Sequence, residues 1–256
     1  MMLGGCAYER QIPEQESVET VSQSGYEALD NTGSGWGFVR KKGSEPEVTK
    51  SQQEMLEKYG ACYMDKTKPK AIYLTFDEGY ENGYTSKILD VLEATKTPAA
   101  FFVTGPYLES QTELVQRMAD DGHILGNHTV NHINMPKSSV ETIQKELNEL
   151  NAACEEKYGV TMKYMRPPEG EYSERTLAIA RDMGYKTIFW SFAYKDWDVN
   201  IQQGAEYAFN QVTPYLHDGA ILLLHAVSSD NANALESIIN YAKEQGYEFR
   251  SLDQLQ

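Results

Sequence analysis

The feature that most constrains the fold is a regular alternation, from Ala71 onward, of short apolar segments with longer amphipathic ones. The apolar segments have the length and composition of strands buried on both faces, and the amphipathic segments have the length of helices. Gly122, Gly184, Gly219 and Gly246 lie between helices and the strands that follow, where helix C-caps favour glycine. The alternation predicts an α/β fold with a parallel sheet and right-handed crossovers, closed or nearly closed into a distorted (β/α) barrel.

The elements expected from this pattern cover most of the chain after Ala71. The expected strands are 71–79, 99–104, 123–126, a short one leading into Arg166, 186–191, 220–225 and 248–252, and the expected helices are 84–94, 111–121, 140–157, 174–183, 204–215 and 231–244. No internal repeat and no second domain are visible. We therefore expect one barrel domain over residues 71–256.

The sequence before Ala71 predicts two further regions. Leu3-Gly4-Gly5-Cys6 resembles the end of a bacterial lipoprotein signal, in which Cys6 would carry the lipid; the alternative is a chance match in an expression scar. The stretch that follows is rich in Glu, Ser and Gln, which predicts a flexible tether over residues 1–34. Residues 35–70 are expected to form an extension packed on the barrel. The expected location is extracytoplasmic, with the chain anchored at the outer face of the cell membrane through Cys6.

Charge and cysteine content exclude several classes of partner. The net charge of −15 argues against nucleic acid and against electrostatic docking on an anionic membrane. No run approaches the roughly 18 apolar residues of a transmembrane helix. Cys62 and Cys154 lie far apart in the sequence and predict no disulfide framework, so we expect small buried residues.

Two groups of polar residues at strand ends indicate a metal site. Asp77 and Glu78 end the strand that begins at Ala71, although acids at this point could instead cap the next helix. His128 and His132 follow the strand 123–126, and on a helical turn their four-residue spacing would place both imidazoles on one face. With one carboxylate they would form a His₂-carboxylate set for a divalent metal; capping or solvated histidines are the alternative.

A proline motif follows the next strand. In Arg166-Pro167-Pro168-Glu169-Gly170, the two prolines fix an extended backbone that can aim the arginine and the amides of Glu169 and Gly170 inward. A rigid turn without a functional role is the alternative.

The last two groups are an aromatic loop and a histidine at a strand end. Asp196-Trp197-Asp198 places an aromatic ring beside acids, which suits stacking on a sugar but equally suits ordinary loop packing. The strand 220–225 ends in His225, either as a proton carrier or as a satisfied core histidine.

Together these groups resemble the polysaccharide deacetylase family, the NodB-homology domains of carbohydrate esterase family 4, over roughly residues 73–255. The resemblance lies in five motifs that occur in order: 75–79 (TFDEG), 128–132 (HTVNH), 166–170 (RPPEG), 196–197 (DW) and 222–225 (LLLH). Further stretches resemble the branch of delta-lactam-forming de-N-acetylases, which act on N-acetylmuramic acid in spore cortex peptidoglycan: 80–84, 101–105, 225–228, 36–37 and 58–60.

The resemblance implies a NodB-type barrel that hydrolyses amides with the help of a divalent metal, zinc above all, with cobalt, manganese or another ion as alternatives. It implies that Asp77 is the general base, that Arg166 orients it, and that His225 is the general acid. By the same resemblance Asp196 partners His225. The implied metal ligands are Glu78, His128 and His132, and the implied substrate or oxyanion residues are Glu169, Gly170, Trp197 and Leu223.

One departure concerns Glu78, because the usual family pattern has Asp at that position and the delta-lactam branch tends to have Asn. The added methylene shifts the carboxylate by about a bond length, while metal–oxygen distances hold to roughly ±0.2 Å. We therefore expect a weaker, different or differently coordinated metal. For the lactyl carboxylate of a muramic substrate, Arg166, Arg175 and Lys195 are the expected contacts.

The expected substrate is N-acetylmuramic acid in peptidoglycan, and no protein partner is predicted. The alternatives are a deacetylase of N-acetylglucosamine units in peptidoglycan or chitin-like glycans, and a catalytically silent glycan-binding lipoprotein. A glycoside hydrolase that uses two of the carboxylates at the barrel mouth is a further alternative.

Overall fold

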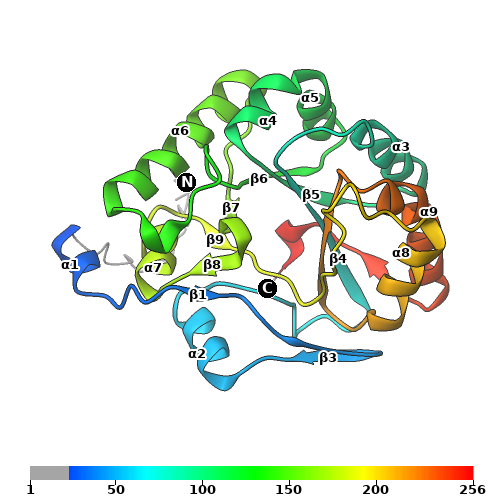
Figure 1. Cartoon of the computed structure of the whole chain (residues 1–256), viewed down its shortest axis with the longest axis horizontal. Coiled ribbons are helices and arrows are strands. Elements are labelled where there is room, and N and C mark those ends of the chain that lie inside the picture. The colour runs from blue at the N-terminus through cyan, green and yellow to red at the C-terminus, as the bar shows by residue number, and fades with distance from the viewer. Residues whose placement is uncertain (1–22, 256) are drawn as a thin grey trace, which may run out of the picture.

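A computed structural model describes residues 23–255 and shows a sheet of parallel strands surrounded by helices (Figure 1). The predicted lipid site at Cys6 lies outside the described residues. Within them, no helix is long and apolar enough to cross a membrane. Cys62 and Cys154 are free thiols; Cys154 is buried as predicted, whereas Cys62 is only half-buried.

The central sheet has the order β10-β4-β5-β6-β7-β9, with β11 also paired to β4, and all its ladders are parallel. Its strands are β4 (Ala71–Glu78), β5 (Ala99–Val103), β6 (Ile124–Asn127), β7 (Tyr164–Met165), β9 (Lys186–Thr187), β10 (Ala220–His225) and β11 (Glu248–Phe249). Between β9 and β10 only isolated bridges occur, including Phe192 with Leu222. The sheet therefore forms a partly closed barrel, and the predicted distorted α/β barrel is confirmed.

The helices match the predicted ones to within a few residues at most boundaries. They are α3 (Thr85–Thr95), α4 (Gly105–Ser110), α5 (Thr112–Asp120), α6 (Val140–Tyr158), α7 (Glu174–Asp182), α8 (Ala205–Val212) and α9 (Ser229–Glu244). Helix α4 was not predicted; it is a short helix with Pro106 in its first turn, where proline is tolerated. The strands expected at 186–191 and 248–252 are each only two residues long, because the chain leaves the ladder after Thr187 and after Phe249.

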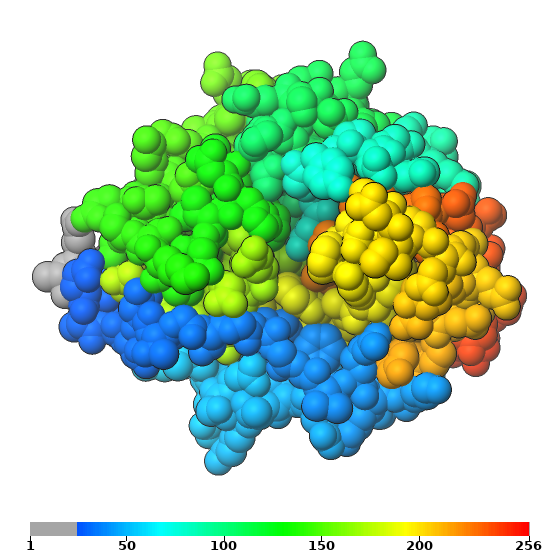
Figure 2. All heavy atoms as spheres, in the orientation of Figure 1, coloured from blue at the N-terminus to red at the C-terminus, as the bar shows by residue number. Residues whose placement is uncertain are grey.

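The N-terminal region runs along one side of the barrel, at the lower edge of Figures 1 and 2. It contains α1 (Gln23–Glu27), β1 (Ser34–Gly35), the hairpin of β2 (Val39–Lys41) and β3 (Ser44–Glu47), and α2 (Lys50–Lys58). Tyr26 is buried and its hydroxyl donates to Asp182 on α7. The predicted tether is thus wrong for residues 23–34, because the buried tyrosine anchors this segment to the barrel.

Side-chain alternation along β4 divides the strand between two packing environments. Tyr73 belongs to the apolar cluster inside the barrel, while Leu74 and Phe76 belong to the cluster shared with the outer helices. Because successive side chains of a strand point to opposite faces, Asp77 shares the inner face with Tyr73 and Glu78 shares the outer face with Phe76. The two adjacent acids therefore enter different surroundings.

Gly126 on β6 tests how tightly the barrel interior is packed. A Cβ atom at Gly126 would lie 2.5 Å from the Phe102 ring, which itself lies 4.2 Å from the Arg166 guanidinium. Gly126→Ala must displace that ring, so we expect the free energy of unfolding to fall by about 1–3 kcal/mol in denaturant titration. Gly37→Ala, where a Cβ meets nothing within 4 Å, is the control and should change stability far less. Equal stability of the two variants would contradict this packing.

Candidate active site

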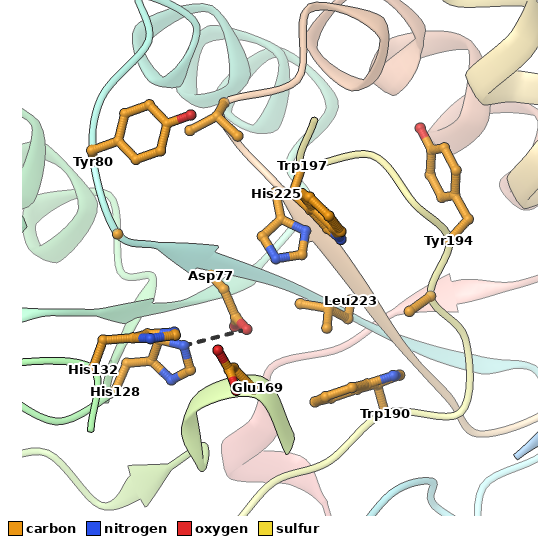
Figure 3. A pocket seen from close by; sticks show the side chains of 13 residues that line it. Asp77, Tyr80, His128, His132, Glu169, Trp190, Tyr194, Trp197, Leu223 and His225 are labelled. Atoms are coloured by element: carbon orange, nitrogen blue, oxygen red, sulfur yellow. Dashed lines mark ion pairs between the residues drawn. The ribbon is translucent and has the colours of Figure 1, made fainter. Parts of the chain in front are cut away.

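A cavity of about 790 Å³ opens at the carboxyl ends of β4, β6 and β10, where a parallel barrel places its functional side chains (Figure 3). Of the residues predicted from the sequence, those that line it are Asp77, His128, His132, Glu169, Trp197, Leu223 and His225. Arg166 and Asp196 are buried and bind lining residues directly. Gly170 is buried next to Glu169, and Glu78 is not part of the lining.

Asp77 is held in an ionised state by a buried arginine. Arg166 is 0% exposed, and its Nη1 donates to Asp77 Oδ1 at 2.7 Å while its Nη2 donates to Thr75 Oγ1 at 2.9 Å. Burial alone would raise the pKa of Asp77, but the charge of Arg166, followed by His128 and His225, lowers that pKa below its ordinary value. Asp77 is therefore a carboxylate at neutral pH, with Oδ2 free of the arginine.

The two histidines come together without the helical turn that the sequence predicted. Thr129 and His132 have left-handed backbones, with φ of 62° and 52°, and the chain from His128 to His132 is an irregular loop. The imidazole rings nevertheless meet edge to face, with centroids 4.9 Å apart. A loop with two left-handed residues thus achieves the pairing that was expected from a helix.

The surroundings of His128 favour a neutral imidazole whose Nε2 lone pair is available to a metal ion. Its Nδ1 lies 2.8 Å from the Arg166 carbonyl oxygen, and because a carbonyl only accepts, Nδ1 carries the hydrogen and Nε2 keeps its lone pair. Nε2 lies 3.6 Å from Asp77 Oδ2. Burial is the main cause that lowers the pKa of His128 to about 4, against the opposing effect of Asp77. A neutral imidazole with a fixed tautomer is the form that binds a metal.

The histidine pair fits a divalent cation, whereas Glu78 does not complete the predicted ligand set. Glu78 is 0% exposed, and neither carboxyl oxygen has a hydrogen-bond partner. Burial, together with Glu81 and Asp77, raises the pKa of Glu78 well above its ordinary value and so favours its protonated form. Among residues 23–255, no three His, Cys, Asp or Glu side chains are grouped closely enough to hold a metal. The predicted three-residue set is therefore corrected to His128 and His132, because strand alternation turns Glu78 away from them.

His225 and Asp196 form a second hydrogen-bonded pair at the cavity. His225 Nδ1 and Asp196 Oδ1 lie 2.7 Å apart, and Asp196 Oδ2 accepts from the His225 main-chain N–H at 2.9 Å. Burial would lower the pKa of His225, but the charge and hydrogen bond of Asp196 raise it above the ordinary value. Asn231 also donates from Nδ2 to Asp196 Oδ2 at 2.6 Å. Asn231 lies in α9 outside every motif, so no sequence signal pointed to it.

The Pro-Pro motif forms a short 3₁₀ turn, η2 (Pro168–Gly170), beside Asp77 and the histidines. Glu169 has a left-handed backbone with φ of 57°, which is unfavourable for a residue with a side chain. The Gly170 carbonyl accepts from the main-chain N–H of Trp36, and the Trp36 indole donates to the Trp190 carbonyl at 2.9 Å. The N-terminal extension therefore supports the turn, a role that the sequence analysis did not foresee.

Two exposed aromatic side chains stand at the mouth of the cavity. Trp197 is 53% exposed, as suits the predicted sugar contact, and Tyr80 is 54% exposed and was missed. Lys195 lies over the Trp197 ring and pairs with Asp198, while Arg175 binds Glu27 and the Ser138 carbonyl. Neither of these two cations lines the cavity, and the third expected contact, Arg166, is fully buried against Asp77, so the expected contacts for a lactyl carboxylate are not supported.

Comparison with known proteins agrees with this geometry. Residues 64–188 match the model of the polysaccharide deacetylase family. The chain is 46% identical to the peptidoglycan-N-acetylmuramic acid deacetylase PdaA of Bacillus subtilis over 234 residues, which is 90% of this chain and 88% of PdaA. It is 32% identical to a Bacillus cereus peptidoglycan-N-acetylglucosamine deacetylase over 191 residues, which is 73% of this chain and 88% of that protein.

Solved structures of related proteins have the same fold. The B. subtilis PdaA structure matches with a TM-score of 0.86 at 44% identity, and covers 89% of this chain and 98% of that one. A Bacillus anthracis family 4 carbohydrate esterase matches with a TM-score of 0.76, also at 44% identity and with the same coverage. The chain therefore belongs to the polysaccharide deacetylase family. Its predicted family, fold and class, hydrolases that act on amide bonds, are confirmed.

The burial of Glu78 predicts how the stability of the protein depends on pH and whether a Glu78 variant keeps its metal. In the unfolded chain its pKa is near 4.5, and folding raises it, so folding takes up a proton above pH 4.5 and stability falls as pH rises toward the folded pKa. Glu78→Gln removes this dependence. We expect its unfolding free energy to exceed that of wild type increasingly above pH 4.5, by at most about 1.4 kcal/mol per pH unit.

The same variant should keep its metal, whereas His128→Ala should lose it. Denaturant titration at several pH values and elemental analysis give the two measurements. A Glu78→Gln protein that lost its metal would restore Glu78 as a ligand and refute this placement.

Proposed function

We propose that this protein removes the acetyl group from N-acetylmuramic acid residues of peptidoglycan with the help of a divalent metal, zinc being the expected ion. The observation that carries the proposal is the presence in one cavity of an ionised carboxylate, Asp77, and a histidine with a raised pKa, His225. Two titratable groups whose surroundings drive their protonation in opposite directions make a base and an acid available at one pH. The identity to PdaA supports the choice of substrate.

The residues of the cavity can perform each proton transfer of amide hydrolysis. A divalent ion at His128 and His132 would polarise the acetyl carbonyl and lower the pKa of a water molecule. Asp77 takes a proton from the attacking water at Oδ2, since Oδ1 is bound to Arg166. We assign the amide of Glu169, in its left-handed turn, as a donor to the oxyanion that forms on the acetyl oxygen.

His225 completes the reaction. The Nδ1–H of His225 stays hydrogen-bonded to Asp196. Nε2 is therefore the atom that gives a proton to the departing amine when the C–N bond breaks. The products are acetate and the free amino sugar. Before the next cycle Asp77 gives up its proton to solvent and His225 takes one up at Nε2, which returns both groups to their starting states.

A second candidate is a glycan-binding protein without catalytic activity, and the burial of Glu78 is the observation that favours it. The exposed Trp197 and Tyr80 would serve a binding protein as well as an enzyme. A glycoside hydrolase has lost support, because Glu78 is buried and Asp196 is bonded to His225 and Asn231.

The proposal also covers the cellular location of the protein. The resemblance around Cys6 supports a lipid anchor at the outer face of the membrane, where peptidoglycan lies. Mass spectrometry of the protein isolated from its host would find a lipid on Cys6; an unmodified thiol would refute the anchor.

Acetate release tests the activity directly. We expect chelator-treated enzyme to release acetate from peptidoglycan only after zinc, cobalt or manganese is restored, and Asp77→Asn to lower kcat by about 10²- to 10⁴-fold. N-acetylglucosamine oligosaccharides in parallel identify the preferred sugar. Absence of acetate from both glycans with every metal would favour the binding protein.

The pH dependence of the reaction tests the His225–Asp196 pair. Without the Asp196 charge, burial dominates and lowers the pKa of His225, so Asp196→Asn should leave the acid deprotonated at a lower pH. We therefore expect the basic limb of the kcat profile to move to lower pH, together with the NMR titration of the His225 ring. An unchanged basic limb would exclude His225 as the acid.

A further inference from the structure

We propose that Glu146, which lies outside the cavity, is a positioning residue that holds His132 in place for metal binding; the inference rests on the proposed metal-dependent function. Glu146 projects from α6 and is 7% exposed. Its Oε2 accepts from the Asn131 main-chain N–H at 2.7 Å, and its Oε1 accepts from the Asn131 side-chain amide at 2.6 Å. One carboxylate therefore accepts two hydrogen bonds from Asn131, the residue directly before His132.

The loop needs such support because its backbone is strained. Thr129 and His132 both have left-handed φ angles, which residues with side chains adopt only when their surroundings enforce it. No hydrogen bond reaches the His132 ring from any residue in the part of the chain that the structure describes. The position of this imidazole therefore depends on how its backbone is held.

Two adjacent residues of α6 fix two points of the loop. The Asn127 side-chain amide donates to the Leu147 carbonyl at 2.9 Å, at the point where the loop leaves β6. Glu146, one residue earlier in α6, binds Asn131 near the other end. His128 has its own anchor in the Arg166 carbonyl, whereas the backbone around His132 is held before it by Glu146, through Asn131, and after it by Thr129 Oγ1, which accepts from the Ile133 N–H at 3.2 Å.

A carboxylate is the group that this contact requires. Two donors, one from the main chain and one from a side chain, approach two separate oxygens, and only an ionised acid offers two acceptors. Glu146→Gln keeps the size and shape of the side chain but places an N–H₂ group against one donor. The variant should loosen the loop without opening a cavity.

The test is zinc affinity of the folded, chelator-stripped protein, measured by competition with a chromophoric chelator. We expect Glu146→Gln to weaken zinc binding about 10- to 100-fold, the range found for groups that orient metal-binding histidines. The matched control is Glu149→Gln on the same helix, an exposed acid paired with Lys145, which should leave affinity unchanged. Thermal unfolding of each variant shows whether the protein remains folded.

A double variant separates positioning from general destabilisation. In Glu146→Gln with Asn131→Ala, the opposing side-chain amide is gone and the glutamine oxygen can accept from the main-chain N–H at residue 131. We expect zinc affinity to recover partly relative to Glu146→Gln alone. Should Glu146→Gln fail to fold, Asn131→Ala alone removes one of the two hydrogen bonds at an exposed residue, and it should weaken zinc binding several-fold.

Zinc affinity of Glu146→Gln equal to that of wild type, or of Asn131→Ala if the former does not fold, would overturn the positioning role. Loss of affinity that the double variant deepens additively would overturn it as well. The zinc affinities of wild type and the variants could follow the expected order while wild type released no acetate from any glycan. In that case the positioning role would stand and the proposed deacetylase function would fail.

Discussion

The site depends above all on the buried ion pair between Arg166 and Asp77. The guanidinium is fully enclosed, where an unpaired cation would be strongly destabilising. It is satisfied by Asp77, Thr75 and the Ile188 carbonyl, and it stacks on the Phe102 ring. These contacts join strands β4, β5 and β7 and the segment after β9, so the barrel interior and the Asp77 carboxylate are held by the same group. The carbonyl of this residue also selects the tautomer of His128, a second function of one position in the chain.

Around that pair, protonation follows from local surroundings. Asp77, Glu78 and His225 lie at the ends of two paired strands, yet the pKa of the first carboxyl is lowered, that of the second is raised, and that of the histidine is raised. The arginine beside Asp77, the absence of partners around Glu78 and the carboxylate behind His225 account for these differences. Acid and base chemistry at one pH follows from these three different environments.

The supports of the site come from segments far away in the sequence. Trp36 in the N-terminal extension binds the Gly170 and Trp190 carbonyls, Glu146 in α6 holds the histidine loop, and Asn231 in α9 holds Asp196. Each contributes hydrogen bonds that stop a catalytic element from relaxing, as precise sites require of their surroundings. A parallel barrel allows this because the carboxyl ends of its strands lie at one face, where side chains of the surrounding helices and of the N-terminal extension also contact the site.

The sequence alone predicted the alternation of strands and helices, hence the parallel barrel, and it indicated residues that line the cavity, because polar groups such as Asp77, His128 and His225 lie at the ends of apolar strands. It could not place Glu78, since neighbours in sequence point to opposite faces of a strand and only the packed helices decide which face is dry. It also could not show that the histidine loop is left-handed at Thr129 and His132, or that Glu146, Asn231 and Trp36 hold the site. Those contacts join residues separated widely along the chain, and only the tertiary structure brings them within hydrogen-bonding distance.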